Sequence, residues 1–216
     1  AVNTVGFQWA SSPASTELEN IVCDWTCEML NLPKKFYLNN TGGGCIATSI
    51  GDALLLSIQM AKYKKMKELG VWFGDPKISN FVAYISDYSF IAYYRHFFLK
   101  EIKHVRKIPS ILKDNKISLD LDYFYKTYEE DVKNGLIPFF YGGTIGSTCT
   151  NSSDPVDVLG KFCREKGIHY NVDSAYASSF MCIPDIRERY DLEYINSICI
   201  NLSKAGLCGL GSSQFY

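Results

Sequence analysis

The chain has 216 residues, of which 47% are hydrophobic and 21% are charged, and its net charge is −1. This balance is ordinary for a globular protein and is sufficient for one large domain. It argues against a dedicated nucleic-acid binder, because such proteins carry a clustered excess of positive charge. No apolar run is long enough to span a bilayer, so we expect neither a nucleic-acid nor a membrane partner.

Cysteine and histidine are scattered rather than clustered. The eight cysteines form no C-x-x-C pair, and the three histidines lie far apart in the sequence. Zinc sites need closely spaced ligands, so we expect no metal site. Free thiols of this kind are typical of a reducing compartment, and the first residues show no signal peptide, so we expect a cytoplasmic protein.

Helical and extended patterns alternate along the chain. Helices are predicted at about residues 16–29, 49–68, 88–99, 119–133 and 155–166, and strands at about 80–86, 104–108, 137–141, 168–173 and 195–200. The first helix has a Thr16-x-x-Glu19 capping pattern, and the strand that ends at Tyr141 is predicted to break at Gly142 and Gly143.

The alternation predicts an α/β fold: one domain, residues 1–216, with a mostly parallel sheet between layers of helices. Ligands of such sheets bind beyond the carboxyl ends of the strands. Asp173, the run 144–148 and Lys204 each follow a predicted strand. We therefore expect these three loops to converge on one site.

Asp173 and Lys204 are chemically suited to pyridoxal 5′-phosphate. An amine can form an imine with the cofactor's aldehyde, and a carboxylate can hold the pyridine nitrogen protonated. The sequence therefore predicts a pyridoxal-phosphate site between the two strand ends.

Several short strings resemble those of one family. They are Val5–Trp9, Ser12–Glu19, Gly42–Gly44, Gly135–Phe140 and Val172–Ala177. Together they resemble the group II pyridoxal-phosphate-dependent decarboxylases, which include the aromatic-L-amino-acid, histidine and tyrosine decarboxylases. The resemblance implies the large domain of an aspartate-aminotransferase-like enzyme (fold type I), with the family's N-terminal segment and C-terminal small domain absent. It also implies a homodimer, or a dimer with a full-length homologue.

The resemblance assigns roles to residues around the expected site. Lys204 matches the lysine that forms the Schiff base, Asp173 the partner of the ring nitrogen, and Ala175 a small residue under the ring. The other matches are phosphate-binding positions after the glycine turn (Ser49, Ile50, Gly51), two further cofactor contacts (Thr148, Asn201) and two residues that line the substrate pocket or pack in the core (Phe7, Trp9).

Two positions depart from the family pattern. Phe90 stands where the family has a histidine that stacks on the cofactor and moves protons, and Ser203 stands where it has a histidine before the lysine. Phenylalanine can stack but cannot exchange a proton. The sequence runs for 12 residues after Lys204, and we expect none of them to take the place of the catalytic tyrosine on the family's mobile loop.

Three hypotheses follow. The chain is a carboxy-lyase that decarboxylates an aromatic or related L-amino acid, with poor turnover in isolation. Alternatively, it is an aromatic aldehyde synthase, because some relatives without the stacking histidine are such enzymes. The third hypothesis is a non-catalytic homologue or dimerisation module.

Overall fold

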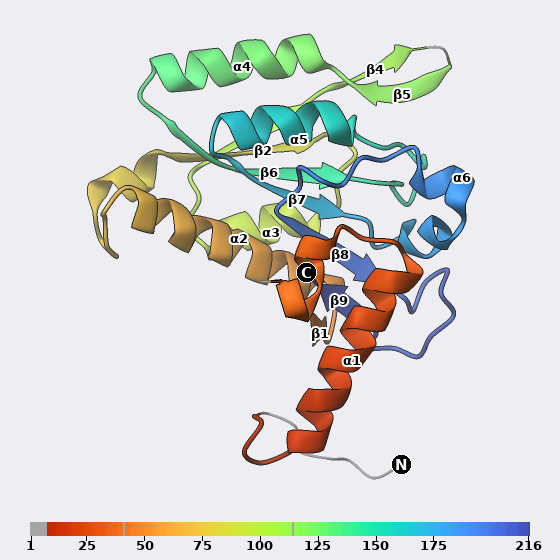
Figure 1. Cartoon of the computed structure of the whole chain (residues 1–216). Coiled ribbons are helices and arrows are strands. Elements are labelled where there is room, and N and C mark those ends of the chain that lie inside the picture. The colour runs from red at the N-terminus through yellow and green to blue at the C-terminus, as the bar shows by residue number, and fades with distance from the viewer. Residues whose placement is uncertain (1–7, 41, 114) are drawn as a thin grey trace.

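The computed structural model describes residues 8–40, 42–113 and 115–216. Within these residues a seven-stranded sheet lies between two layers of helices (Figure 1). None of the described helices is long and apolar enough to cross a membrane.

The sheet is mostly parallel, as predicted. Its strand order is β1-β9-β8-β7-β6-β2-β3, and β9 alone runs against its neighbours β8 and β1. The strands are β1 (Cys45–Ala47), β2 (Phe81–Ser86), β3 (His104–Ile108), β6 (Ile137–Thr144), β7 (His169–Asp173), β8 (Ser197–Asn201) and β9 (Ser213–Phe215). A separate hairpin, β4 (Ser110–Lys113) with β5 (Lys116–Leu119), follows β3.

Helices cover both faces of the sheet (Figure 1). On one face α1 (Pro13–Met29), α4 (Leu121–Lys133) and α5 (Val156–Glu165) contribute to one hydrophobic core, and on the other α2 (Ile50–Glu68) and α3 (Ala92–Leu99) contribute to a second. The short α6 (Pro184–Arg187) lies between β7 and β8 in the chain. A parallel sheet covered on both faces is buried throughout, and all six residues of β2 are accordingly buried.

The two glycines in β6 do not end the strand, so the predicted break at this point is wrong. β6 continues through Gly142 and Gly143 to Thr144. A Cβ atom on Gly142 would lie 2.8 Å from the ring of Tyr93, and one on Gly143 would lie 2.6 Å from the ring of Tyr170. Glycine is therefore present because aromatic rings pack directly on the strand backbone.

The first helix begins at Pro13, earlier than the capping pattern predicts, and its N-cap is Ser12. Its apolar residues point two ways. Cys23 and Cys27 are buried, whereas a stripe of larger side chains is exposed: Leu18 (60%), Ile21 (43%), Trp25 (65%) and Met29 (48%). The helical spacing is correct, but the described residues leave this stripe uncovered, which is typical of a surface that binds a partner.

Candidate active site

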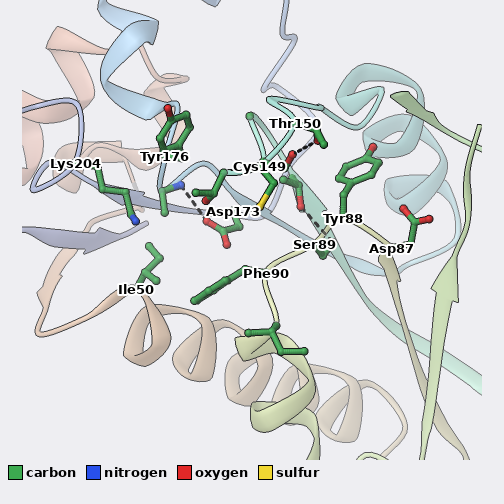
Figure 2. A pocket seen from close by; sticks show the side chains of 16 residues that line it. Ile50, Asp87, Tyr88, Ser89, Phe90, Cys149, Thr150, Asp173, Tyr176 and Lys204 are labelled. Atoms are coloured by element: carbon green, nitrogen blue, oxygen red, sulfur yellow. Dashed lines mark hydrogen bonds between the residues drawn. The ribbon is translucent and has the colours of Figure 1, made fainter. Parts of the chain in front are cut away.

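A cavity of about 390 Å³ lies at the carboxyl ends of the central strands. Its lining comes from the loops after β2, β6, β7 and β8 and from the start of α2. Figure 2 shows the amine of Lys204 and the carboxylate of Asp173 facing the same open space, with Ile50 and Phe90 across from them. The predicted convergence of Asp173, Thr148 and Lys204 is thus present in the structure.

Asp173 is the last residue of β7 and is 6% exposed. One carboxylate oxygen accepts a hydrogen bond from the Ala175 backbone N–H at 2.9 Å. Burial raises the pKa of Asp173 to about 6, although that hydrogen bond and the positive charge of Lys204 oppose the increase. A buried carboxylate that borders a cavity is suited to hold a cationic ligand group, because such a group stabilises its ionised form.

Lys204 is held in the turn that follows β8. Its backbone N–H donates to the Asn201 carbonyl at 3.4 Å, and its own carbonyl accepts from Leu207 N–H at 3.1 Å. The side chain is exposed and enters the cavity from the side opposite Phe90. An accessible amine in this position can reach a ligand that also contacts Asp173.

The loop between β2 and α3 forms a second wall. Phe90 lines the cavity and is 45% exposed, so its ring is available for stacking on a flat ligand. The Tyr88 hydroxyl donates to the buried Asp154 carboxylate at 2.5 Å, and Asp154 also accepts from the Thr144 N–H at 2.9 Å. Burial raises the pKa of Asp154 to about 7, while these two hydrogen bonds lower it. Asp154 therefore ties the loop after β2 to the end of β6.

The predicted phosphate-binding positions lie at the start of α2. Ile50 lines the cavity, but the described lining residues include neither Ser49 nor Gly51. Ser49 is the N-cap of α2: its hydroxyl accepts from Asp52 N–H at 3.2 Å and donates to the Asp52 carboxylate at 2.9 Å. Asn201 also lies outside the described lining, and its side-chain oxygen accepts from the Ser203 N–H at 2.9 Å.

The remaining predicted residues divide into two groups. Ala175 and Thr148 line the cavity. Trp9 does not belong to the described lining: it is 60% exposed and donates its indole N–H to Glu17 at 3.1 Å. Phe7 lies outside the described residues.

Several lining residues were not anticipated from the sequence. They are Asp87, Tyr88, Ser89, Cys149 and Tyr176. The rule that led to Asp173 applies equally to the end of β2, and would have identified the run 87–89. Asp154 offered no such signal, because it lies in a loop and its importance depends on a contact across the sheet.

The residues present fit pyridoxal phosphate. The cavity offers an accessible amine, a buried carboxylate, a small residue at Ala175 and an aromatic ring at Phe90. The first turn of α2, whose Ile50 borders the cavity, supplies a helix N-terminus suited to a phosphate. No cluster of metal ligands occurs among the described residues.

Fold and cavity together define a class: an aspartate-aminotransferase-like large domain with a lysine and an aspartate at the carboxyl ends of its strands. A family model described as the pyridoxal-dependent decarboxylase conserved domain matches residues 1–216. The chain therefore belongs to the pyridoxal-dependent decarboxylase family.

Individual relatives agree with this assignment. The chain is 36% identical over 207 residues to the aromatic-L-amino-acid decarboxylase of Catharanthus roseus. This alignment covers 94% of the chain and 40% of the relative. The Oryza sativa TDC, solved with PLP and tryptamine, has a TM-score of 0.91 and 29% identity over 99% of this chain and 44% of its own. The 4-hydroxyphenylacetaldehyde synthase of Rhodiola rosea has a TM-score of 0.90 and 34% identity, and the match covers 98% of this chain and 45% of the synthase. The chain thus spans less than half the length of these relatives.

Proposed function

We propose that this chain binds pyridoxal 5′-phosphate in the cavity between Asp173 and Lys204 and forms the large-domain part of a carboxy-lyase. The substrate class is an aromatic or related L-amino acid. The observation that carries the proposal is that Lys204 and Asp173, from different strand ends, line one cavity. The identity to the Catharanthus roseus aromatic-L-amino-acid decarboxylase supports the reaction class.

Each residue has a physical role in this proposal. Lys204 supplies the amine that attaches the cofactor, and Asp173 holds a proton on the pyridine nitrogen. The protonated nitrogen lowers the pKa of Asp173, which keeps its carboxylate ionised. Bound pyridoxal phosphate supplies an electron sink for the carbanion left when carbon dioxide departs from an amino acid.

The cavity walls orient the bound ring. Phe90 stacks on one face, and Ala175 is small enough to let the ring approach the sheet. Thr148 would be a neighbouring polar contact, and the start of α2 (Ser49, Ile50, Gly51) and Asn201 would hold the phosphate. Trp9 lies outside the described cavity lining, so the proposed contact of Trp9 and Phe7 with the substrate side chain rests on the family resemblance alone.

A partner chain is part of the proposal. The exposed stripe of Leu18, Ile21, Trp25 and Met29 on α1 supports a dimer, either with a second copy or with a longer homologue. If the main role of the chain is to bind a partner through this surface, the chain is a dimerisation module rather than an enzyme.

A second candidate function is an aromatic aldehyde synthase. Phe90 occupies the wall of the cavity where an imidazole would be needed to exchange a proton, and the Rhodiola rosea synthase is among the similar structures. Such an enzyme would consume dioxygen and water, and it would release an aldehyde, hydrogen peroxide and ammonia in addition to carbon dioxide.

Product analysis tests these proposals. The chain is loaded with cofactor and supplied with L-tryptophan, L-tyrosine or L-phenylalanine, and carbon dioxide, amine, peroxide and ammonia are measured. Carbon dioxide with amine supports the carboxy-lyase, and equal release of peroxide and ammonia supports the synthase. If the loaded chain yields none of these products, either alone or paired with a full-length homologue that has been inactivated at its own Schiff-base lysine, both enzymatic proposals fail.

A further inference from the structure

Three polar side chains converge at the second residue of α2. A Cβ atom placed on Gly51 would lie 3.0 Å from the Arg95 guanidinium (Nη2), 3.4 Å from the His96 ring (Nε2) and 3.4 Å from the Ser49 hydroxyl. Arg95 and His96 are neighbours on α3, which packs beside α2. Because Gly51 has no side chain, these groups can approach the backbone of the helix N-terminus closely.

His96 is the unusual member of this group. It is 4% exposed, and neither ring nitrogen has a hydrogen-bond partner among the described residues. Leaving buried polar atoms unpaired is costly, so a buried imidazole of this kind calls for an explanation. Burial and the charge of Arg95 lower the pKa of His96, so the neutral ring still has one N–H to donate.

The backbone supplies further donors at the same place. Within the described part of the chain, the N–H groups of Ile50 and Gly51 have no acceptor, whereas the next N–H, that of Asp52, is capped by Ser49. The first turn of a helix carries partial positive charge and attracts anions. Arg95 makes no ion pair within the described residues, so its charge is also available.

One nearby group is negative. Asp52 lies in the first turn of α2, and hydrogen bonds from Thr48 and Ser49 lower its pKa. The Asp52 carboxylate accepts hydrogen bonds from the Thr48 and Ser49 hydroxyls, so it already has partners and the Ser49 hydroxyl is already engaged. The free donors are therefore the two backbone N–H groups, Arg95 and His96, and all four are suited to an anion with several oxygens.

We propose that Arg95 and His96 complete an anion site at the start of α2 and bind the phosphate group of the cofactor beside Gly51, where no side chain separates them from the helix backbone. The inference rests on the proposed cofactor binding for the identity of the ligand. The shared chemistry is a phosphate dianion, so free inorganic phosphate should occupy the same site.

The test compares ligands with and without a phosphate. Dissociation constants for pyridoxal 5′-phosphate, pyridoxal and inorganic phosphate are measured with the wild-type chain, Arg95→Gln and His96→Phe. Lys67→Gln is the matched control, because it removes one positive charge from the far end of α2. In addition, NMR follows the His96 imidazole of the wild-type chain as inorganic phosphate is added.

Either substitution should weaken binding of pyridoxal phosphate and inorganic phosphate by about tenfold or more, as expected for loss of one charge-assisted hydrogen bond. Pyridoxal binding and the Lys67→Gln control should be unchanged. Phosphate should also shift the His96 resonances. An unshifted His96, or an equal loss of pyridoxal and pyridoxal-phosphate affinity in the variants, overturns the inference.

The outcomes separate this inference from the proposed function. If phosphate shifts His96 and requires Arg95, but pyridoxal phosphate never becomes attached to Lys204, the anion site stands and the proposed function fails. If the cofactor attaches to Lys204 with unchanged affinity in Arg95→Gln and His96→Phe, the proposed function stands and the anion site is wrong.

Discussion

Asp173 and Lys204 face one cavity, although Asp173 ends β7 and Lys204 lies in the turn after β8. The two strands are parallel neighbours, so their carboxyl ends open at the same edge of the sheet. The amine and the carboxylate act on each other even without a ligand, since Lys204 lowers the pKa that burial has raised in Asp173. This arrangement underlies the proposed cofactor site.

Asp173→Asn should stabilise the cofactor-free chain and weaken cofactor binding. The pKa of Asp173 is about 6 in the folded chain, compared with 3.8 ordinarily. The folded chain therefore retains a proton that the unfolded chain loses, and the free energy of unfolding decreases as the pH rises from about 4 to about 6. Replacing the carboxyl removes that decrease, so the variant should gain about 3 kcal/mol relative to wild type over this range.

Urea unfolding at pH 4 and at pH 7.5 or above measures this difference, with the exposed carboxylate variant Glu188→Gln as control. A difference between Asp173→Asn and wild type that stays constant with pH would contradict the prediction. The same variant should bind pyridoxal phosphate at least about tenfold more weakly, because its amide cannot hold the ring nitrogen protonated.

Phe90→His should shift the products toward the amine. An imidazole in the cavity wall can exchange a proton with the substrate, which phenylalanine cannot do, and such catalysis typically contributes about a hundredfold or more. We expect carbon dioxide release to rise at least about tenfold relative to peroxide release. Ile91→His is the matched control, since Ile91 also lines the cavity but is 71% exposed. An equal gain in both variants would show that position 90 has no special role.

Trp25→Ser should weaken self-association. Trp25 is 65% exposed in the middle of the apolar stripe on α1, and aromatic residues contribute strongly to interfaces. Sedimentation equilibrium should show the dimer dissociation constant rising about tenfold or more. Leu112→Ser on the β4–β5 hairpin, 74% exposed, is the control and should have little effect. A wild-type chain that stays monomeric at all concentrations, and does not bind a full-length homologue, would contradict the proposed interface.

Gly143→Ala should destabilise the fold although the change adds one methyl group. That carbon would lie 2.6 Å from the Tyr170 ring, and Gly143 and Tyr170 are both buried in the sheet. Such overpacking typically costs about 1–3 kcal/mol, which thermal or urea unfolding can detect. Gly209→Ala should cost much less, because nothing lies within 4 Å of the added carbon. Equal stability of the two variants would refute the packing explanation for this glycine.

The sequence predicted those features that depend on local pattern. The apolar run of β2 and the spacing of α5 identify elements close to their observed bounds. The convergence of Asp173 and Lys204 follows from a rule about parallel sheets. In contrast, β1 and β9 have three residues each and are strands only because β1 pairs with β9 and β9 pairs with β8.

Other features depend on contacts that no local pattern encodes. The bond between Tyr88 and Asp154 joins residues 66 positions apart and requires the ends of β2 and β6 to be adjacent. Similarly, the spacing of Leu18 and Trp25 predicts a helix but does not specify what covers that face. The pairing of Arg95 and His96 with Gly51 also becomes visible only when α2 and α3 are packed together.

The most direct test of the central claim is to locate the attached cofactor. The chain is saturated with pyridoxal 5′-phosphate, the linkage is reduced with borohydride, and the labelled peptide is identified by mass spectrometry. We expect a single label on Lys204 that is absent from Lys204→Ala. Lys103 is an exposed lysine outside the cavity, so the control variant Lys103→Ala should be labelled like the wild type. A label on another lysine, or no label at saturating cofactor, would contradict it.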